Sequence, residues 1–284
     1  MFKKIFFVTA LLLASLLSAK PVVIASIAPV GYLAKAVGGD KIEVQSLAKG
    51  DVHSYEPKPN DMKAVAKARI FIAAGLEFEE AWIPRFKASA KNLVVVQSDA
   101  KIAKLKEERG EQAEHDEKHE AHADPHVWLN PMLAITMARN ISDALIDMDK
   151  ANKDFYLENF QKLMNDLLAF DESAKNELAG LKNRKFVVYH PAWGYFAEHY
   201  DLEQISIERS GKEPKIDEMA STVKMIKDEN IKVIFADPNR SQKSAQVLAS
   251  QTGAKVELLD PLGYNLLENL KIAVGAIKDA NSPK

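Results

Sequence analysis

The sequence predicts an α/β fold of two lobes, each with a parallel β-sheet flanked by helices, joined by one long rigid α-helix. Short, continuous apolar runs alternate with helical stretches in both halves of the chain, which is typical of parallel strands covered on both faces. A chain of 284 residues is also too long for one ordinary core and about the right length for two domains.

Four expected strands lie in the first half of the chain and three in the second. Those of the first half lie within 21–27, 41–47, 68–75 and 92–99, and those of the second within 185–190, 231–237 and 254–260. Because each run is short and bounded by polar or turn residues, the intervening stretches are expected to be helices and loops.

Residues 147–182 are predicted to form the linking helix. This segment contains no proline, its only glycine is Gly180, and apolar residues recur in it at helical spacing. At about 1.5 Å per residue it would run roughly 45–50 Å, enough to span two domains. We therefore expect an N-terminal lobe over 20–146 and a C-terminal lobe over 183–284, with restricted movement between them.

The first 19 residues have the pattern of a secretory signal peptide. Lys3 and Lys4 precede an apolar stretch over 5–17, and small residues ending at Ala19 mark the expected cleavage site. The stretch is shorter than the roughly 20 apolar residues that span a bilayer. The sequence has no cysteine, which excludes disulfides, thiolate ligands and a lipid-bearing cysteine. We expect a soluble protein of the periplasm.

Charge argues against nucleic acid as a partner. The formal net charge is −2, and removing a leader that holds two lysines and no acids lowers it to −4. The rest of the chain contains no basic tract suited to binding nucleic acid.

Four separate segments each place a metal-ligand side chain beside a proline or a turn. The residues are His53 in DVHSYEP, His126 in DPHVWLNP, His190 in YHPAWGY and Asp260 in LDPLG. Three neutral imidazoles and one carboxylate complete a tetrahedral shell for a divalent ion, zinc above all. Two of them end predicted strands, where ligands bind in open parallel sheets, so we expect the ion in the interdomain cleft.

Each of these residues has an alternative interpretation. A lone histidine in a loop is often a surface residue, and His190 could be a buried histidine with a satisfied hydrogen bond. Asp260 could be a turn former only. Asp237, in FADPNR at another predicted strand end, competes for the fourth position.

A second group of histidines lies in the acidic tract 107–124. His115, His119 and His122 stand among many acids with almost nothing apolar to bury, so the tract is predicted to be a mobile loop. Its histidines form a candidate accessory metal site of low affinity, since His115 and His119 could chelate at i, i+4 spacing.

Five motifs in order, DVHSYEPKPND, DPHVWLNP, YHPAWGYFA, SGKEP and LDPLG, resemble the metal-binding solute receptors of ABC transporters of the ZnuA/TroA type. The resemblance covers essentially the whole mature chain. It implies two α/β lobes joined by a long helix, ligands at His53, His126, His190 and Asp260 rather than Asp237, and delivery of the ion to a membrane permease. We also expect a monomeric carrier rather than an enzyme.

Histidine at the third ligand position favours Zn²⁺, with Mn²⁺ or iron as the alternative, because imidazole nitrogens suit zinc and oxygen ligands suit manganese. Protonated imidazole cannot ligate, so binding is expected to weaken as the pH falls toward about 6.5 and below.

Two other classes compete with a metal carrier. A secreted zinc hydrolase would use three histidines and a water, but the chain has no HExxH pair. An adhesin or a receptor for an organic solute would line its cleft with aromatic or arginine side chains instead of converging imidazoles.

Overall fold

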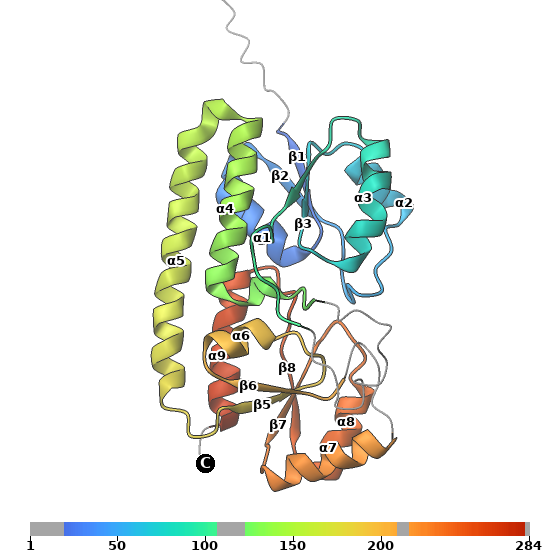
Figure 1. The fold of residues 1–284 in the computed structure, drawn as a ribbon, viewed down its shortest axis with the longest axis vertical. Coiled ribbons are helices and arrows are strands. Elements are labelled where there is room, and N and C mark those ends of the chain that lie inside the picture. The colour runs from blue at the N-terminus through green and yellow to red at the C-terminus, as the bar shows by residue number, and fades with distance from the viewer. Residues whose placement is uncertain (1–19, 107–122, 209–215, 282–284) are drawn as a thin grey trace, which may run out of the picture.

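The computed structural model describes residues 20–106, 123–208 and 216–281. The predicted signal peptide and the histidines His115, His119 and His122 lie outside these residues. The described chain forms two lobes stacked along its longest axis, with one helix running beside both (Figure 1).

The N-terminal lobe is built on a four-stranded parallel sheet in the order β2-β1-β3-β4. Its strands are β1 (Val22–Ala25), β2 (Glu43–Ser46), β3 (Ile70–Ala73) and β4 (Val94–Gln97). Its helices are α1 (Ala28–Gly38), α2 (Pro59–Val65), α3 (Glu77–Ser89) and α4 (Pro131–Met148). The central strand β3 is buried along its whole length, as expected for a strand covered on both faces.

The C-terminal lobe repeats this arrangement with the strand order β6-β5-β7-β8, again all parallel. Its strands are β5 (Lys185–Val188), β6 (Glu203–Ser206), β7 (Val233–Ala236) and β8 (Lys255–Leu258). Its helices are α6 (Gly194–His199), α7 (Ile216–Asp228), α8 (Lys243–Thr252) and α9 (Leu266–Asn281).

Each of the seven predicted segments contains a strand, but the sequence analysis missed β6. The strand has the sequence EQIS and lies at the edge of its sheet, with Glu203 exposed and Gln204 buried. An edge strand of this kind lacks the continuous apolar run by which buried parallel strands are recognised, so it gave no signal.

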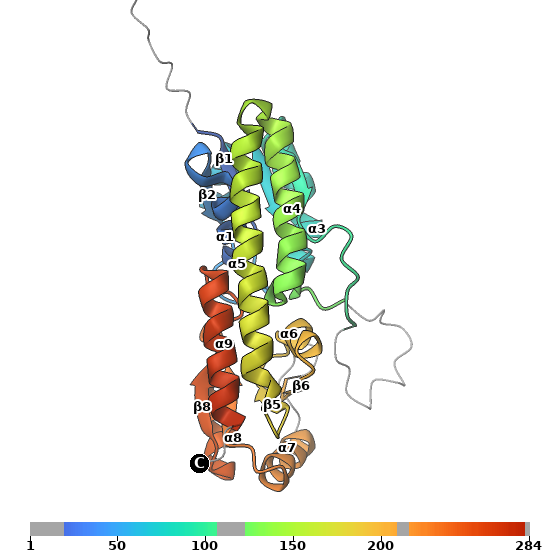
Figure 2. The same cartoon turned by 90° about the vertical axis from the view of Figure 1, so that its left-hand side faces the viewer.

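The long helix α5 (Lys153–Ala179) has 27 residues, or about 40 Å at 1.5 Å per residue, and is shorter than the predicted segment. Residues 147 and 148 end α4 instead, and the chain turns at Asp149, whose backbone angles are not helical. The Asp149 carboxylate accepts hydrogen bonds from Asn152 Nδ2 and Tyr156 Oη, which stabilises the turn. Figure 2 shows α5 passing from α4 in one lobe to α9 in the other.

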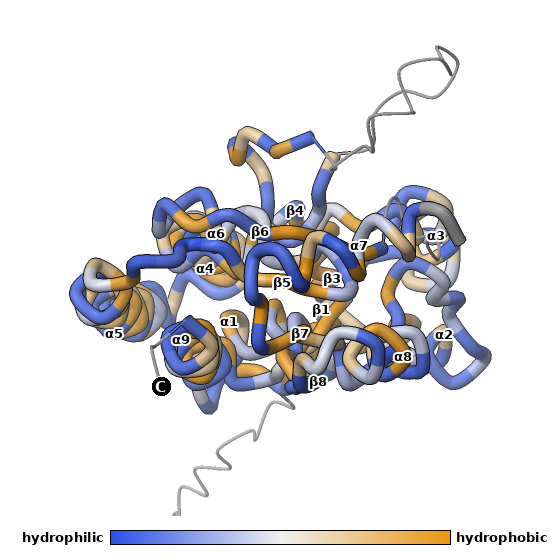
Figure 3. The backbone as a smooth tube through the Cα atoms, turned by 90° about the horizontal axis from the view of Figure 1, so that it is seen from below, coloured by the Kyte–Doolittle hydropathy of each residue, from blue (hydrophilic) through white to orange (hydrophobic). Residues whose placement is uncertain are grey.

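The two lobes share one continuous hydrophobic core on the side of α5. Buried residues of α1 and α4 belong to the same cluster as those of β5 and α9, and the buried face of α5 connects them. Figure 3 shows the apolar strands at the centre, with the polar segments toward the outside. Because close-packed interiors resist deformation, this shared core restricts movement between the lobes.

No helix in the described parts of the chain has both the length and the apolar character needed to cross a membrane.

Candidate metal centre

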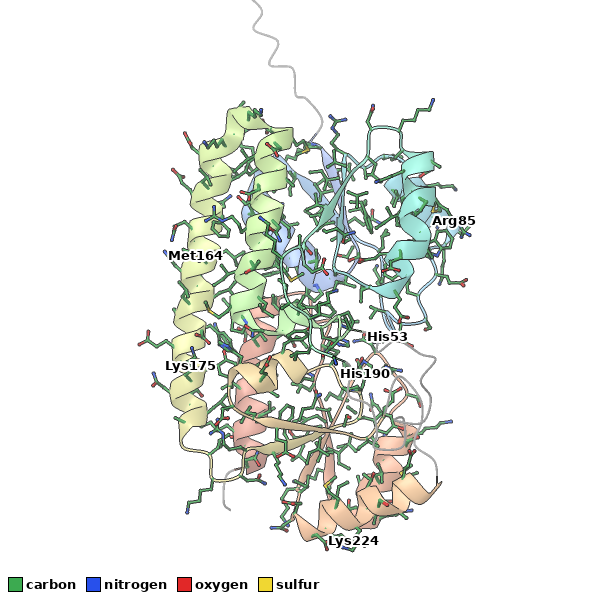
Figure 4. All side chains as sticks on the ribbon, viewed as in Figure 1. His53, Arg85, Met164, Lys175, His190 and Lys224 are labelled. Atoms are coloured by element: carbon green, nitrogen blue, oxygen red, sulfur yellow. The ribbon has the colours of Figure 1, made fainter. Side chains whose placement is uncertain are left out.

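Three histidines from both lobes converge at the junction between the sheets. His53, His126 and His190 each offer a ring nitrogen, and these nitrogens all lie within 4.8 Å of one another. His53 Nε2 is 3.2 Å from His190 Nε2, and Figure 4 shows these two side chains close together between the lobes. Imidazole nitrogens clustered in this way are a ready set of ligands for a transition-metal ion.

His53 is presented by the loop that follows β2. Asp51 forms a turn there, because its carboxylate accepts hydrogen bonds from the His53 backbone N–H, at 3.2 Å, and from the Ser54 hydroxyl, at 3.0 Å. The side chain of His53 is half-buried, which leaves it the most accessible of the three imidazoles.

His126 is fixed by the aspartate two residues before it. One oxygen of the buried Asp124 carboxylate accepts from the His126 backbone N–H at 2.9 Å and lies 2.7 Å from His126 Nδ1. A hydrogen on Nδ1 satisfies this contact and leaves Nε2 with a free lone pair for a metal. The 3₁₀ turn Val127–Leu129 and the N-cap Asn130 of α4 follow at once, so this loop is rigidly attached.

His190 lies two residues beyond the end of β5 and is buried. Its Nδ1 is 2.8 Å from Oε2 of the buried Glu208, which follows β6. Arg240, in the turn after β7, places Nη1 2.7 Å from the same Nδ1 and donates from Nη2 to Glu208 Oε1 at 2.9 Å.

Asp260 lies outside the group of three histidines. Its Oδ1 accepts from Asn239 Nδ2 and from the Leu262 backbone N–H, both at 2.8 Å. Both of these hydrogen bonds go to one oxygen, so the carboxylate is anchored at Oδ1. The competing residue Asp237 is largely buried, and its Oδ1 accepts from the backbone N–H and the side chain of Asn239.

Direct hydrogen bonds join the loops of the two lobes around these histidines. The fully buried Trp128 donates from Nε1 to the Pro261 carbonyl at 2.7 Å, which ties the loop of His126 to the loop of Asp260. The Tyr195 hydroxyl donates to the Asp124 carbonyl at 2.7 Å and accepts from the Leu105 N–H at 2.9 Å. The ligand-bearing loops therefore form one connected structure.

Comparison with known proteins assigns the chain to a family. The family described as ZnuA, zinc-uptake complex component A, periplasmic, matches residues 23–280. The chain belongs to this family.

Individual ZnuA relatives agree with this assignment. The high-affinity zinc uptake system protein ZnuA of Bacillus subtilis (strain 168) is 30% identical over 279 residues, covering 91% of this chain and 86% of the relative. The zinc-binding lipoprotein AdcA of Streptococcus pneumoniae serotype 4 is 29% identical, and the match spans 82% of this chain but only 48% of that longer protein.

Solved ZnuA structures have the same fold. A crystal structure of ZnuA is 35% identical with a TM-score of 0.85, and covers 93% of this chain and 100% of that one. A zinc-bound ZnuA deletion mutant is 34% identical with a TM-score of 0.86, and covers 93% of this chain and 99% of that one. The predicted two-lobe α/β class and the resemblance to this family are confirmed.

Asp124 and Arg240, whose side chains contact the rings of His126 and His190, were not predicted from the sequence of this ZnuA family member. Asp124 stands at i−2 from His126 in Asp-Pro-His, a local signal that could have identified it as the hydrogen-bond partner of the ring. Arg240 is 50 residues from His190, and no local pattern connects the two.

Burial favours the neutral form of two of the three imidazoles, those of His53 and His190. Burial, together with the neighbouring His126, lowers the pKa of His53 to about 4. Burial first, and then His126 and Arg240, hold the pKa of His190 well below its ordinary value of 6.5. Metal binding should therefore weaken at a lower pH than the value near 6.5 expected from the sequence, because the protons compete less.

The same shift predicts how the stability of the metal-free protein depends on pH. The folded-state pKa of His53 is below the unfolded value of about 6.5, so the unfolded chain takes up protons first as the pH falls. The free energy of unfolding keeps its full value above about pH 6.5. It falls between about pH 6.5 and 4, and His53 alone accounts for about 3 kcal/mol of that loss.

Urea unfolding at several pH values, in the presence of a chelator, would measure this loss. The His53→Gln variant, which cannot titrate, should show a shallower decline over the same window. Parallel stability curves for the two proteins would contradict the prediction.

Proposed function

We propose that this chain captures Zn²⁺ outside the cytoplasm in the cleft between its lobes and delivers the ion to an ABC-type membrane permease for uptake. The observation that carries the proposal is the convergence of His53, His126 and His190, whose ring nitrogens lie within 4.8 Å of one another. The zinc uptake and zinc-binding functions named for its relatives support the same ion.

The proposed shell consists of these three histidines and Asp260. Asp260 enters as the fourth ligand through its second oxygen, while Asn239 and the Leu262 N–H hold the first. Because its carboxylate lies outside the group of imidazole nitrogens, it must approach when the ion binds. A small closing movement of the loops is consistent with the shared core, which opposes a wide hinge motion.

A closed shell favours a carrier over a hydrolase. A catalytic zinc site keeps one position open for water or substrate, whereas four protein ligands fill a tetrahedral ion. We therefore propose that the protein has no enzymatic activity and that its partners are the ion and the permease.

The mature protein is proposed to be a monomer of the periplasm. Its domains would be the signal peptide 1–19, the N-terminal lobe 20–146, a linking segment 147–182 that contains the helix α5, and the C-terminal lobe 183–284. The histidines His115, His119 and His122 are proposed as an accessory site that collects zinc and is not required for the main one.

Elemental analysis of the protein purified without added metal tests the choice of ion. We expect close to one equivalent of zinc, and a chelator-stripped sample should bind Zn²⁺ in preference to Mn²⁺ in a competition titration, because three imidazoles favour zinc. Bound manganese or iron, with little affinity for zinc, would assign the receptor to the alternative ion. Absence of any tight metal binding would reject the carrier function.

A further inference from the structure

Arg240 contacts this site but cannot itself ligate a metal. It lies in the turn that follows β7, where its backbone N–H bonds to the Asp237 carbonyl. Its guanidinium contacts His190 Nδ1 and Glu208 at 2.7 and 2.9 Å. The same group lies 4.0 Å from the Asp51 carboxylate of the other lobe. A permanent cation therefore stands beside a proposed ligand of a cation.

The hydrogen-bonding chemistry of His190 makes this contact informative. A guanidinium can only donate, so Arg240 bonds to Nδ1 when that nitrogen carries no hydrogen. The hydrogen of a neutral imidazole is then on Nε2, where His53 Nε2, 3.2 Å away, can accept it. In this tautomer His190 has no lone pair on Nε2 to offer to a metal.

Glu208 favours the opposite tautomer. Its carboxylate can only accept, so the 2.8 Å contact with Nδ1 requires the hydrogen on Nδ1 and frees Nε2 for zinc, as is usual for metal-ligating histidines. Arg240 and Glu208 thus compete for a single nitrogen, and the outcome decides whether His190 can ligate.

The positive charge of Arg240 also opposes zinc binding, as the non-ligating tautomer of His190 does. A zinc ion lies about 2 Å from a ligating imidazole nitrogen, which separates it from the guanidinium by one ring. At an effective dielectric constant of about 20, two cations at such a separation repel by more than thermal energy. Arg240 therefore opposes zinc both by its hydrogen bond to Nδ1 and by its charge.

We propose that Arg240 is an affinity- and release-determining residue, an internal cation that holds His190 in the non-ligating tautomer when the site is empty. Zinc binding displaces the guanidinium from Nδ1 onto Glu208 and Asp51, and loosening of the site returns it. The residue keeps zinc affinity below what the ligands alone would give, so that the permease can remove the ion. This inference rests on the proposed zinc-carrier function.

The opposite role for Arg240 gives an effect of opposite sign. If the guanidinium serves only to position Glu208, its removal should loosen His190 and weaken zinc binding. If it opposes the ion, its removal should strengthen binding and slow release.

The test uses the full mature protein, with chelator competition for the zinc Kd and stopped-flow transfer to excess chelator for the dissociation rate. We expect Arg240→Met to bind zinc roughly tenfold more tightly and to release it correspondingly more slowly. Arg240→Lys retains the charge but not the two directed hydrogen bonds, so its affinity should fall between those of wild type and Arg240→Met. Arg240→Gln also removes the charge but can still bond to Glu208, and replaces the methionine variant if that one does not fold.

Arg85→Met is the matched control, because Arg85 stacks on Trp82 of α3 at 4.5 Å, away from the histidines (Figure 4). It should bind zinc like wild type. In the metal-free protein, ¹⁵N NMR of the His190 ring should show the hydrogen on Nε2 in wild type and on Nδ1 in Arg240→Met, which a purely structural role would not predict.

Weaker or unchanged zinc binding by folded Arg240→Met and Arg240→Gln would overturn this inference and leave the carrier function intact. Failure of the wild-type protein to bind zinc would instead contradict the carrier function itself.

Discussion

Replacing His190 with alanine should abolish tight zinc binding. Four-ligand zinc sites in peptides have apparent binding free energies of about 10–16 kcal/mol, so the share of one ligand is about 3 kcal/mol. The loss should raise the zinc Kd by more than about a hundredfold. His190 is buried between Glu208 and His53, and water cannot readily take its place with the same geometry. Calorimetric titration of zinc into the metal-free protein would measure the change.

His199→Ala is the appropriate control for the loss of a histidine. His199 ends α6, and its Nε2 is 2.6 Å from Asp171 of α5, so it is bonded and partly buried but outside the group of three imidazoles. This variant should retain wild-type zinc affinity. Tight binding that persists in folded His190→Ala would exclude the proposed shell.

Asp260→Asn should weaken zinc binding by at least about tenfold, because the change removes the only anionic ligand of the proposed shell. The asparagine side chain keeps a carbonyl oxygen that can accept from Asn239 and the Leu262 N–H, as Oδ1 does now. The loop should therefore keep its shape while the ligand loses its charge, which contributes more than a neutral hydrogen-bonding group does. The same calorimetric titration measures the effect.

Asp237→Asn provides the matched comparison, since Asp237 follows the neighbouring strand β7 and also bonds to Asn239. We expect its zinc affinity to stay close to that of wild type. A loss of affinity in Asp237→Asn, with none in Asp260→Asn, would assign the fourth position to Asp237.

Local sequence patterns predicted most of the architecture because the buried strands are short apolar runs. The strands β3 and β7, with the sequences IFIA and VIFA, are buried along their whole length, and no helix-period pattern competes with them. The edge strand β6 escaped because half-buried polar residues carry no such signal. The boundary of α5 was displaced because α4 continues to Met148 and the turn at Asp149 has no proline or glycine to mark it.

Some of the site residues could likewise be predicted from local sequence patterns, and others could not. His53, His126 and His190 were recognisable from their segments, and the order of those segments carried the family resemblance. Asp124 could have been recognised as well, since it is two residues from His126. Glu208 and Arg240 are 18 and 50 residues from His190, and their contacts with its ring exist only once β5, β6 and β7 lie side by side.

By itself, the sequence determined that the chain has two parallel α/β lobes, a long helix between them and a set of metal-ligand side chains at strand ends. These features depend on local hydrophobic periodicity and on residue type, which are written along the chain. Only the tertiary structure decided that the two lobes share one core, that three imidazoles meet while Asp260 lies outside their group, and that a guanidinium contacts the ring of His190. Such contacts depend on how strands pack beside one another in space, and no spacing within a single segment encodes them.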